Sequence, residues 1–156
     1  RYTIARKGAR TVNKIVYDIL ENEEDQGLND PKTYLQFKQN CEHYRIQLVN
    51  LLEQIRKKGQ SISGYAATSK STTITNYCEI TSDLIDCIYD STPIKQGKFN
   101  PGTHIPIRPH QEFKENYPDY AVLFGYNHSK EIFAKEQDFI EQGGKWIVYV
   151  PQIEII

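Results

Sequence analysis

The strongest constraint on the fold is the alternation of short apolar runs with helical patterns that begins after Gly59. The expected strands are 60–66, 84–89, about 104–107, 119–124 and 145–150. The expected helices between them are 69–79, 109–116 and 127–142. Strands that alternate with helices are typical of a mostly parallel sheet with helices on both faces. The sequence therefore predicts an α/β, Rossmann-like domain over residues 59–156.

Residues 1–58 have a different pattern, which predicts an N-terminal helical arm. Apolar residues recur there at helical spacing and indicate helices over about 11–24 and 31–58. Thr11 and Asp30 are the expected N-caps of these helices. The chain begins with arginine and contains no methionine, and we expect it to be a fragment of a longer polypeptide. The arm would then link this domain to the part that precedes it.

The composition of the chain indicates which classes of partner and of metal site to expect. The net charge of the 156 residues is -1, which favours neither nucleic acid nor an anionic membrane surface as a partner. No apolar run approaches the roughly 20 residues of a membrane-spanning helix. The three cysteines, Cys41, Cys78 and Cys87, form no CxxC pair, so we expect no zinc site and instead buried free thiols. Free thiols are typical of a reducing cytoplasm.

The first candidate site follows the expected strand 60–66, where a turn of small residues leads into a helix. Backbone N–H groups at a helix start attract phosphate, and ligands of doubly wound folds bind at such junctions. The alternative is a well-capped helix with a solvated lysine. The turn matches neither GxxxxGK[ST] nor GxGxxG. The candidate ligand-binding residues here are Tyr65, Ser69, Lys70, Ser71, Thr72 and Asn76.

Two further loops also follow expected strands. The first begins at Asp90, whose carboxylate could accept hydrogen bonds from ribose, and contains Lys95, Lys98 and His104 among prolines and glycines. The alternative is an ordinary surface loop.

The second loop contains Asn127 and His128, and its alternative role is simple helix capping. His43 and His110 are expected at helix surfaces. No nucleophile, base or paired carboxylates stand out, so we predict a binding site without a catalytic residue.

Two sequence blocks resemble the C-terminal domain of the sugar C-methyltransferase family. GYAATSKSTTITNY over 64–77 is similar to the family's G-Y-G-A-x-A-K-G-x-T turn with its following Asn-Tyr pair. IKQGKFNPGTHIPI over 94–107 is similar to its K-x-G-x-x-x-P-G-x-x-I-P-I block, and the resemblance extends over about residues 10–151. Ala66 and Ser71 stand where the family often has glycine, and a backbone with positive φ would resist both.

The resemblance implies a function for the chain. It would be the substrate-binding domain of an S-adenosylmethionine-dependent C-methyltransferase of deoxysugar biosynthesis, acting on a nucleotide-linked 4-keto sugar. The methyl donor, a zinc ion and the catalytic base would belong to preceding domains, so we expect no cofactor in this chain and no activity from it alone. Its partners would be the nucleotide sugar and the methyl-donor domain of the same polypeptide. Two alternatives remain: a nucleotide- or coenzyme A-sensing module without methyl transfer, and an interaction scaffold that binds no small ligand.

Overall fold

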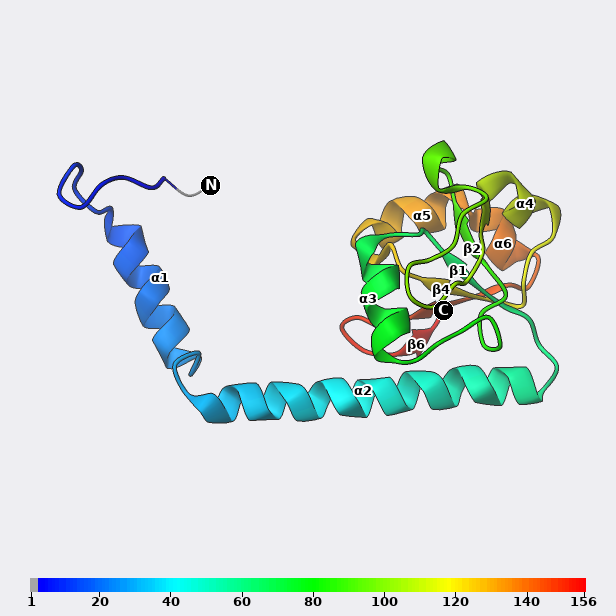
Figure 1. The fold of residues 1–156 in the computed structure, drawn as a ribbon, viewed down its shortest axis with the longest axis horizontal. Helices are drawn as coiled ribbons and strands as arrows, with labels where there is room; N and C mark the ends of the chain where they lie inside the picture. Colours follow the sequence, from blue (N-terminus) through cyan, green and yellow to red (C-terminus); the bar gives the residue numbers. More distant parts are fainter. Residues whose placement is uncertain (1–2) are drawn as a thin grey trace. The chain divides into compact units, whose positions relative to one another are not determined.

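A computed structural model describes residues 3–156 (Figure 1). The chain divides into two compact units, of which the first ends at Cys41 and the second runs from Glu42 to Ile156. Helix α2 (Pro31–Lys57) crosses this boundary, so its second half belongs to the α/β unit. The change of sequence pattern predicted this boundary after residue 58 instead.

The first unit contains α1 (Lys14–Asp25) and the start of α2. The predicted cap at Thr11 is wrong, because the helix begins three residues later and Asn13 Oδ1 accepts the hydrogen bond from the Ile15 N–H at 3.1 Å. The predicted cap at Asp30 is confirmed, since its Oδ1 accepts from the Lys32 N–H at 2.9 Å. No residue of α1 is buried.

The second unit is built on a six-stranded sheet with the order β3-β2-β1-β4-β5-β6. The strands are β1 (Ile62–Tyr65), β2 (Ile88–Asp90), β3 (Ile107–Pro109), β4 (Tyr120–Leu123), β5 (Lys145–Val148) and β6 (Glu154–Ile155). The first five are parallel, and β6 runs antiparallel to β5. This is the strand order of Rossmann folds, so the expected fold class is confirmed. The sequence analysis missed β6, which has only two residues and therefore no alternation to detect.

Helices and short 3-10 turns connect the strands. They are α3 (Ser69–Tyr77), η1 (Pro93–Lys95), α4 (His110–Glu115), η2 (Tyr126–His128), α5 (Ser129–Lys135) and α6 (Gln137–Glu141). The prediction of one helix over 127–142 is wrong, because the backbone leaves helical geometry at Glu136, with φ -110° and ψ 35°. The side chain of that residue turns into the protein interior and is completely buried. Among residues 3–156, no helix combines the length and the apolar character needed to cross a membrane.

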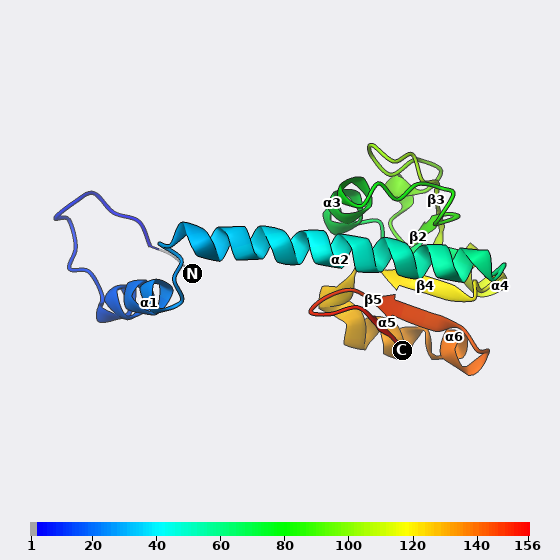
Figure 2. The ribbon, with the colours of Figure 1, turned by 90° about the horizontal axis from the view of Figure 1, so that it is seen from below.

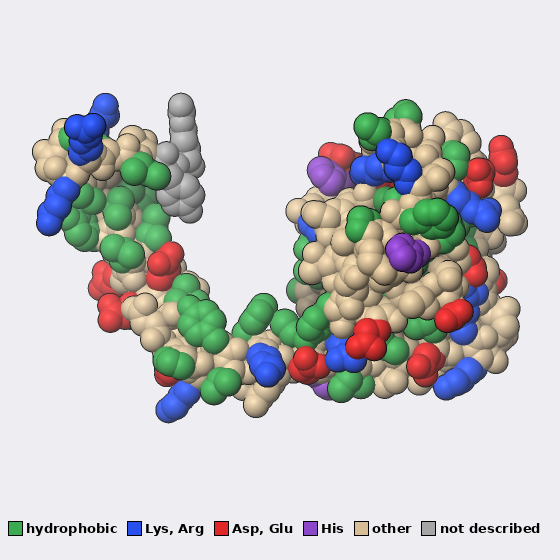
Figure 3. Space-filling model, in the orientation of Figure 1, with side chains coloured by type: hydrophobic (Ala, Val, Ile, Leu, Met, Phe, Trp, Pro, Cys, Tyr) green, Lys and Arg blue, Asp and Glu red, His purple; other side chains and the backbone are tan. Residues whose placement is uncertain are grey.

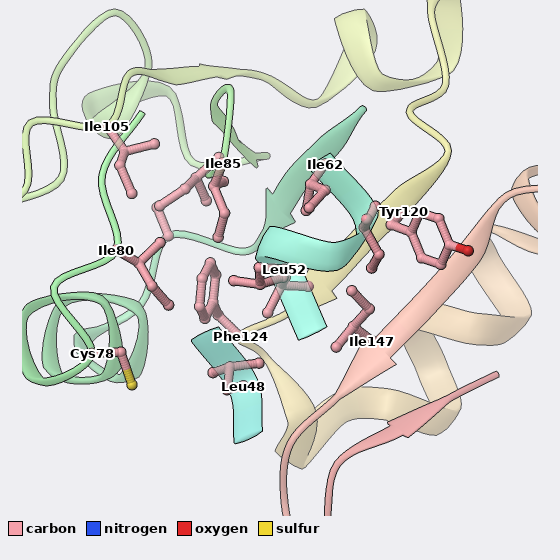
Figure 4. Close-up of a cluster of buried hydrophobic side chains, with 14 of the residues drawn as sticks. Leu48, Leu52, Ile62, Cys78, Ile80, Ile85, Ile105, Tyr120, Phe124 and Ile147 are labelled. Atoms are coloured by element: carbon pink, nitrogen blue, oxygen red, sulfur yellow. The ribbon is translucent and has the colours of Figure 1, made fainter. Parts of the chain in front are cut away.

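Two hydrophobic clusters lie on opposite faces of the sheet, because successive strand residues point to opposite sides. One packs Leu48 and Leu52 of α2 against strand residues that include Ile62 and Ile147 (Figure 4). The other gathers aromatic side chains from α4, α6 and the strands, namely Tyr65, Phe113, Phe139 and Trp146. Figure 2 shows α2 and the helices α5 and α6 in separate layers about the strands.

Candidate functional site

A cavity of about 370 Å³ lies next to the end of β1. Its walls are the turn after β1, the start of α3 and the loop between β2 and β3. Four predicted site residues line it: Ser69, Thr72, Lys95 and Lys98. Figure 3 shows Lys or Arg side chains next to hydrophobic side chains on the upper part of this unit. The structure therefore brings the first and second candidate loops together around one cavity.

The first wall of the cavity is the start of α3. Thr68 has an extended backbone, and its hydroxyl accepts a hydrogen bond from the Ser71 N–H at 3.3 Å. The N–H groups of the first turn have no intrahelical acceptor and form the positive end of the helix dipole. Ser69 and Thr72 contribute hydroxyl groups to the same wall. This wall can donate several hydrogen bonds to an anion.

The turn before α3 contains one unfavourable backbone conformation. Ala66 has φ 70°, in the left-handed region that disfavours residues with a Cβ. The chain therefore keeps the left-handed turn although it has alanine where the family often has glycine. Ser71, at the second departure, lies inside α3, where the backbone is that of an ordinary helix.

A buried amide fixes the second wall, the loop between β2 and β3, to α3. Asn100 is 1% exposed, and its Oδ1 accepts from Ser71 Oγ at 3.2 Å and from Thr72 Oγ1 at 3.3 Å. Its Nδ2 donates to Thr75 Oγ1 at 2.9 Å. Asn76 Nδ2 donates to a loop carbonyl, that of residue 101, at 2.9 Å. Ser71 and Asn76, both predicted to bind ligand, therefore hold the loop in place.

The two lysines of the loop have different surroundings. Lys95 Nζ donates to the Ala67 carbonyl at 2.7 Å and lies 3.3 Å from Asp90 Oδ2. Asp90 is 6% exposed and also accepts from the Thr92 N–H at 2.7 Å. Its carboxylate therefore neutralises Lys95 and anchors the loop. Lys98 is exposed and has no ion pair among the described residues, so its charge is available to a ligand.

Five other predicted residues do not line the cavity, and four of them lie on or near the surface around the third loop or in the loop between β2 and β3. Lys70 Nζ lies over the ring of Tyr126, 5.4 Å from its centroid, and thus faces the loop after β4. That loop contains the exposed residues Asn127 and His128, but no side chain caps η2 or α5. His104 is exposed in the loop between β2 and β3, with φ 55°. The third candidate loop thus belongs to a neighbouring region of the surface.

Tyr65 lies among the aromatic side chains on the opposite face from α2. Its hydroxyl donates to Glu136 Oε1 at 2.9 Å, and His110 Nε2 lies 2.7 Å from the same oxygen. The side chain of His110 is only 12% exposed, so its expected position at a helix surface is wrong. Lys114 and Lys135 lie 3.6 and 3.5 Å from the carboxylate.

The environment of Glu136 determines its charge. Burial acts to raise its pKa, but hydrogen bonds from His110 and Tyr65 outweigh burial and hold the pKa below its ordinary value. Burial and the bond to Glu136 raise the pKa of Tyr65, which therefore stays protonated. The group is a buried carboxylate that joins β1, α4 and the break between α5 and α6. Sequence reasoning missed it, because its members are far apart along the chain.

The prediction of buried free thiols is confirmed for two of the three cysteines, whereas Cys41 is only partly buried. All three thiols are free, and Cys78 and Cys87 are buried. Burial raises the pKa of Cys78 to about 11, so this thiol stays protonated. Within residues 3–156, no three His, Cys, Asp or Glu side chains come together as possible metal ligands.

Comparison with known proteins supports the family resemblance that the two sequence blocks indicate. Residues 1–151 match the family model for the C-methyltransferase C-terminal domain. The C-methyltransferase NovU of Streptomyces niveus is 32% identical over 145 residues. This alignment covers 93% of the chain and 34% of the relative, so the chain spans about a third of the relative's length.

Proposed function

The chain belongs to the family of C-methyltransferase C-terminal domains, and from this premise we propose that it is the part of such an enzyme that holds the substrate. The substrate that we propose is a nucleotide-linked keto sugar of deoxysugar biosynthesis. The observation that carries the proposal is the cavity between α3 and the loop of residues 91–106. Both of its walls come from the two blocks that resemble the family.

The chemistry of the cavity supports a diphosphate as one part of the ligand. A diphosphate carries about two or more negative charges, and the cavity offers the exposed ammonium of Lys98, the hydroxyl of Ser69 and the first turn of α3. Charge-assisted hydrogen bonds of this kind are stronger than neutral ones. Lys70 would add a second charge if it left the Tyr126 ring.

We propose that this chain and the preceding domains of a longer cytoplasmic polypeptide have separate roles in the reaction. S-adenosylmethionine, bound together with a zinc ion by preceding domains, would supply the methyl group, and the catalytic base would lie there too. The residues of this chain would bind and orient the nucleotide, so that the sugar is held at the reaction centre. Holding two reactants in place can contribute about 7–11 kcal/mol to lowering a barrier. The chain alone would therefore bind substrate without converting it.

The helical arm is the part that we propose to contact the methyl-donor domain. In α1, the apolar side chains of Ile15, Val16 and Ile19 are between 43% and 59% exposed, and Val12, just before the helix, is 51% exposed. An amphipathic helix gains most of its stability from an apolar partner surface. We expect hydrogen exchange to be fast in α1 of the isolated chain. Protection equal to that of the central strands, in a strict monomer, would contradict this role.

Calorimetric titration of the chain with nucleoside diphosphates and their sugar esters tests the proposed function. One charge-assisted hydrogen bond contributes roughly 1.5–3 kcal/mol, so we expect Lys98→Ala to weaken binding by about 10- to 150-fold. Lys70→Ala should do the same only if the Lys70 ammonium leaves the Tyr126 ring on binding. Added salt should weaken binding as well, because the cavity is open to solvent. The matched control is Lys57→Ala on α2, where the ammonium faces Glu53 at 3.4 Å. If no nucleotide binds to the wild type, the proposal fails.

A further inference from the structure

Two exposed apolar side chains lie at the mouth of the cavity, and the phosphate contacts do not use them. Ile94 is 74% exposed and Phe99 is 60% exposed, and both line the cavity. These are the highest exposed fractions of any large hydrophobic side chain in the second unit. The protein covers neither side chain, so both offer apolar surface that a ligand in the cavity can bury.

The loop that presents Phe99 is held firmly by backbone hydrogen bonds. Phe99 itself pairs with Pro106 in an isolated antiparallel β-bridge. On one side, the Ile107 N–H donates to the Lys98 carbonyl at 2.8 Å, and on the other, the Asn100 N–H donates to the Ile105 carbonyl at 2.8 Å. The buried side chain of Asn100 then ties this segment to α3. Phe99 is therefore an exposed ring on a fixed backbone, which lowers the entropic cost of binding.

The cavity thus offers an aromatic ring and an aliphatic side chain beside hydroxyls and one unpaired ammonium group. A flat, weakly polar ring joined to an anion would match these groups. We propose that Phe99 stacks on the nucleobase of the ligand, that Ile94 packs against the same base, and that Lys98 faces the phosphates. This inference rests on the proposed function and assigns base recognition to two residues of the loop. Stacking on an aromatic side chain tolerates every base, because each has a π-face.

The test is the affinity of the 156-residue chain for UDP, dTDP, GDP and ADP, compared with inorganic pyrophosphate, which has no base. Loss of one stacking contact costs about 1–3 kcal/mol, so Phe99→Ala should weaken the binding of the nucleotide that binds best by about 5- to 150-fold. Phe99→Trp should retain that affinity, and pyrophosphate should bind equally to wild type and Phe99→Ala. Because the side chain is exposed, the variant should keep the wild-type Tm. Ile140→Ala, which removes a 41% exposed side chain of α6 outside the cavity lining, is the matched control.

The possible outcomes separate this inference from the proposed function. Nucleotide binding that is equal in wild type and Phe99→Ala would overturn the stacking and leave the proposed function intact. Equal losses for nucleotide and pyrophosphate would also overturn it, because Phe99 would then shape the whole cavity. A wild type that binds no nucleotide would remove the proposed function and this inference with it.

Discussion

The buried carboxylate of Glu136 provides the sharpest prediction about stability. The change is Glu136→Gln, which keeps the shape of the side chain and removes its charge. Glu136 accepts from Tyr65 at 2.9 Å and lies 2.7 Å from His110 Nε2. A hydrogen bond to a charged group contributes about 1.5–3 kcal/mol, against 0.5–1.5 for a neutral one. Glu136→Gln replaces two hydrogen bonds to a charged group by neutral ones. It should therefore lower the free energy of unfolding by about 2 kcal/mol.

The two lysines near Glu136 add little to this estimate. Lys114 and Lys135 are 43% and 51% exposed, and solvent screens ion pairs of that kind to about 0–1 kcal/mol. The assay is urea unfolding at pH 7, with Glu131→Gln as the control, since that side chain is 84% exposed. The control should stay within about 0.5 kcal/mol of wild type. If Glu136→Gln stays within the same range, the buried carboxylate does not stabilise the fold.

The same variant has a defined pH dependence. Hydrogen bonds from His110 and Tyr65 depress the pKa of Glu136 in the folded protein despite its burial. A depressed pKa contributes stability that is fully present above the unfolded value, about 4.3, and is lost as the pH falls through the folded value. The gap between wild type and Glu136→Gln should therefore shrink as the pH falls below about 4. A gap that stays constant would show that packing, not charge, causes it.

Three further predictions concern the turn, the loop and the chemistry. Ala66→Gly should raise the free energy of unfolding by about 0.5–1 kcal/mol, because relief of roughly 1–2 kcal/mol of left-handed strain exceeds the added entropy of the unfolded chain; a lower Tm would contradict this. Asn100→Ala should cost about 1–3 kcal/mol by removing the three side-chain hydrogen bonds that tie the loop to α3. It should also speed hydrogen exchange of the Ile107 amide, which donates to the Lys98 carbonyl, and unchanged exchange would refute the anchoring role. The chain incubated with S-adenosylmethionine and nucleotide 4-keto sugars should show no turnover; clear methylation would place the reaction centre in this domain.

Sequence patterns predicted the elements that repeat a local signal. The strands around Ile62, Val122 and Ile147 alternate or run continuously apolar, and the start of α3 follows a turn of small residues, so the sheet and the first wall of the cavity were predictable. The short helices were harder. A helical pattern continues through Glu136, and only the tertiary pairing with His110 explains why the helix breaks there.

Part of the candidate site was also predictable from local sequence signals. Ser69 and Lys98 stand in loops that follow strands, and parallel topology brings such loops together. The burial of Asn100 and the exposure of Phe99 could not be predicted. A Pro- and Gly-rich loop predicts a turn, but it does not predict which of its side chains are buried. Lys70 was one of the predicted ligand-binding residues, yet the structure places its ammonium over an aromatic ring.

The central claim is that the cavity beside α3 holds the nucleotide, and the most direct test is to map the ligand by amide chemical shifts. The chain would be titrated with the nucleoside diphosphate that binds best. A nucleotide bound in the cavity should give the largest shifts at residues 67–72 and 94–101, which contain ten of the eleven cavity-lining residues. Shifts concentrated at residues 124–131 instead, with none in the first two segments, would move the site to the loop after β4 and contradict the account.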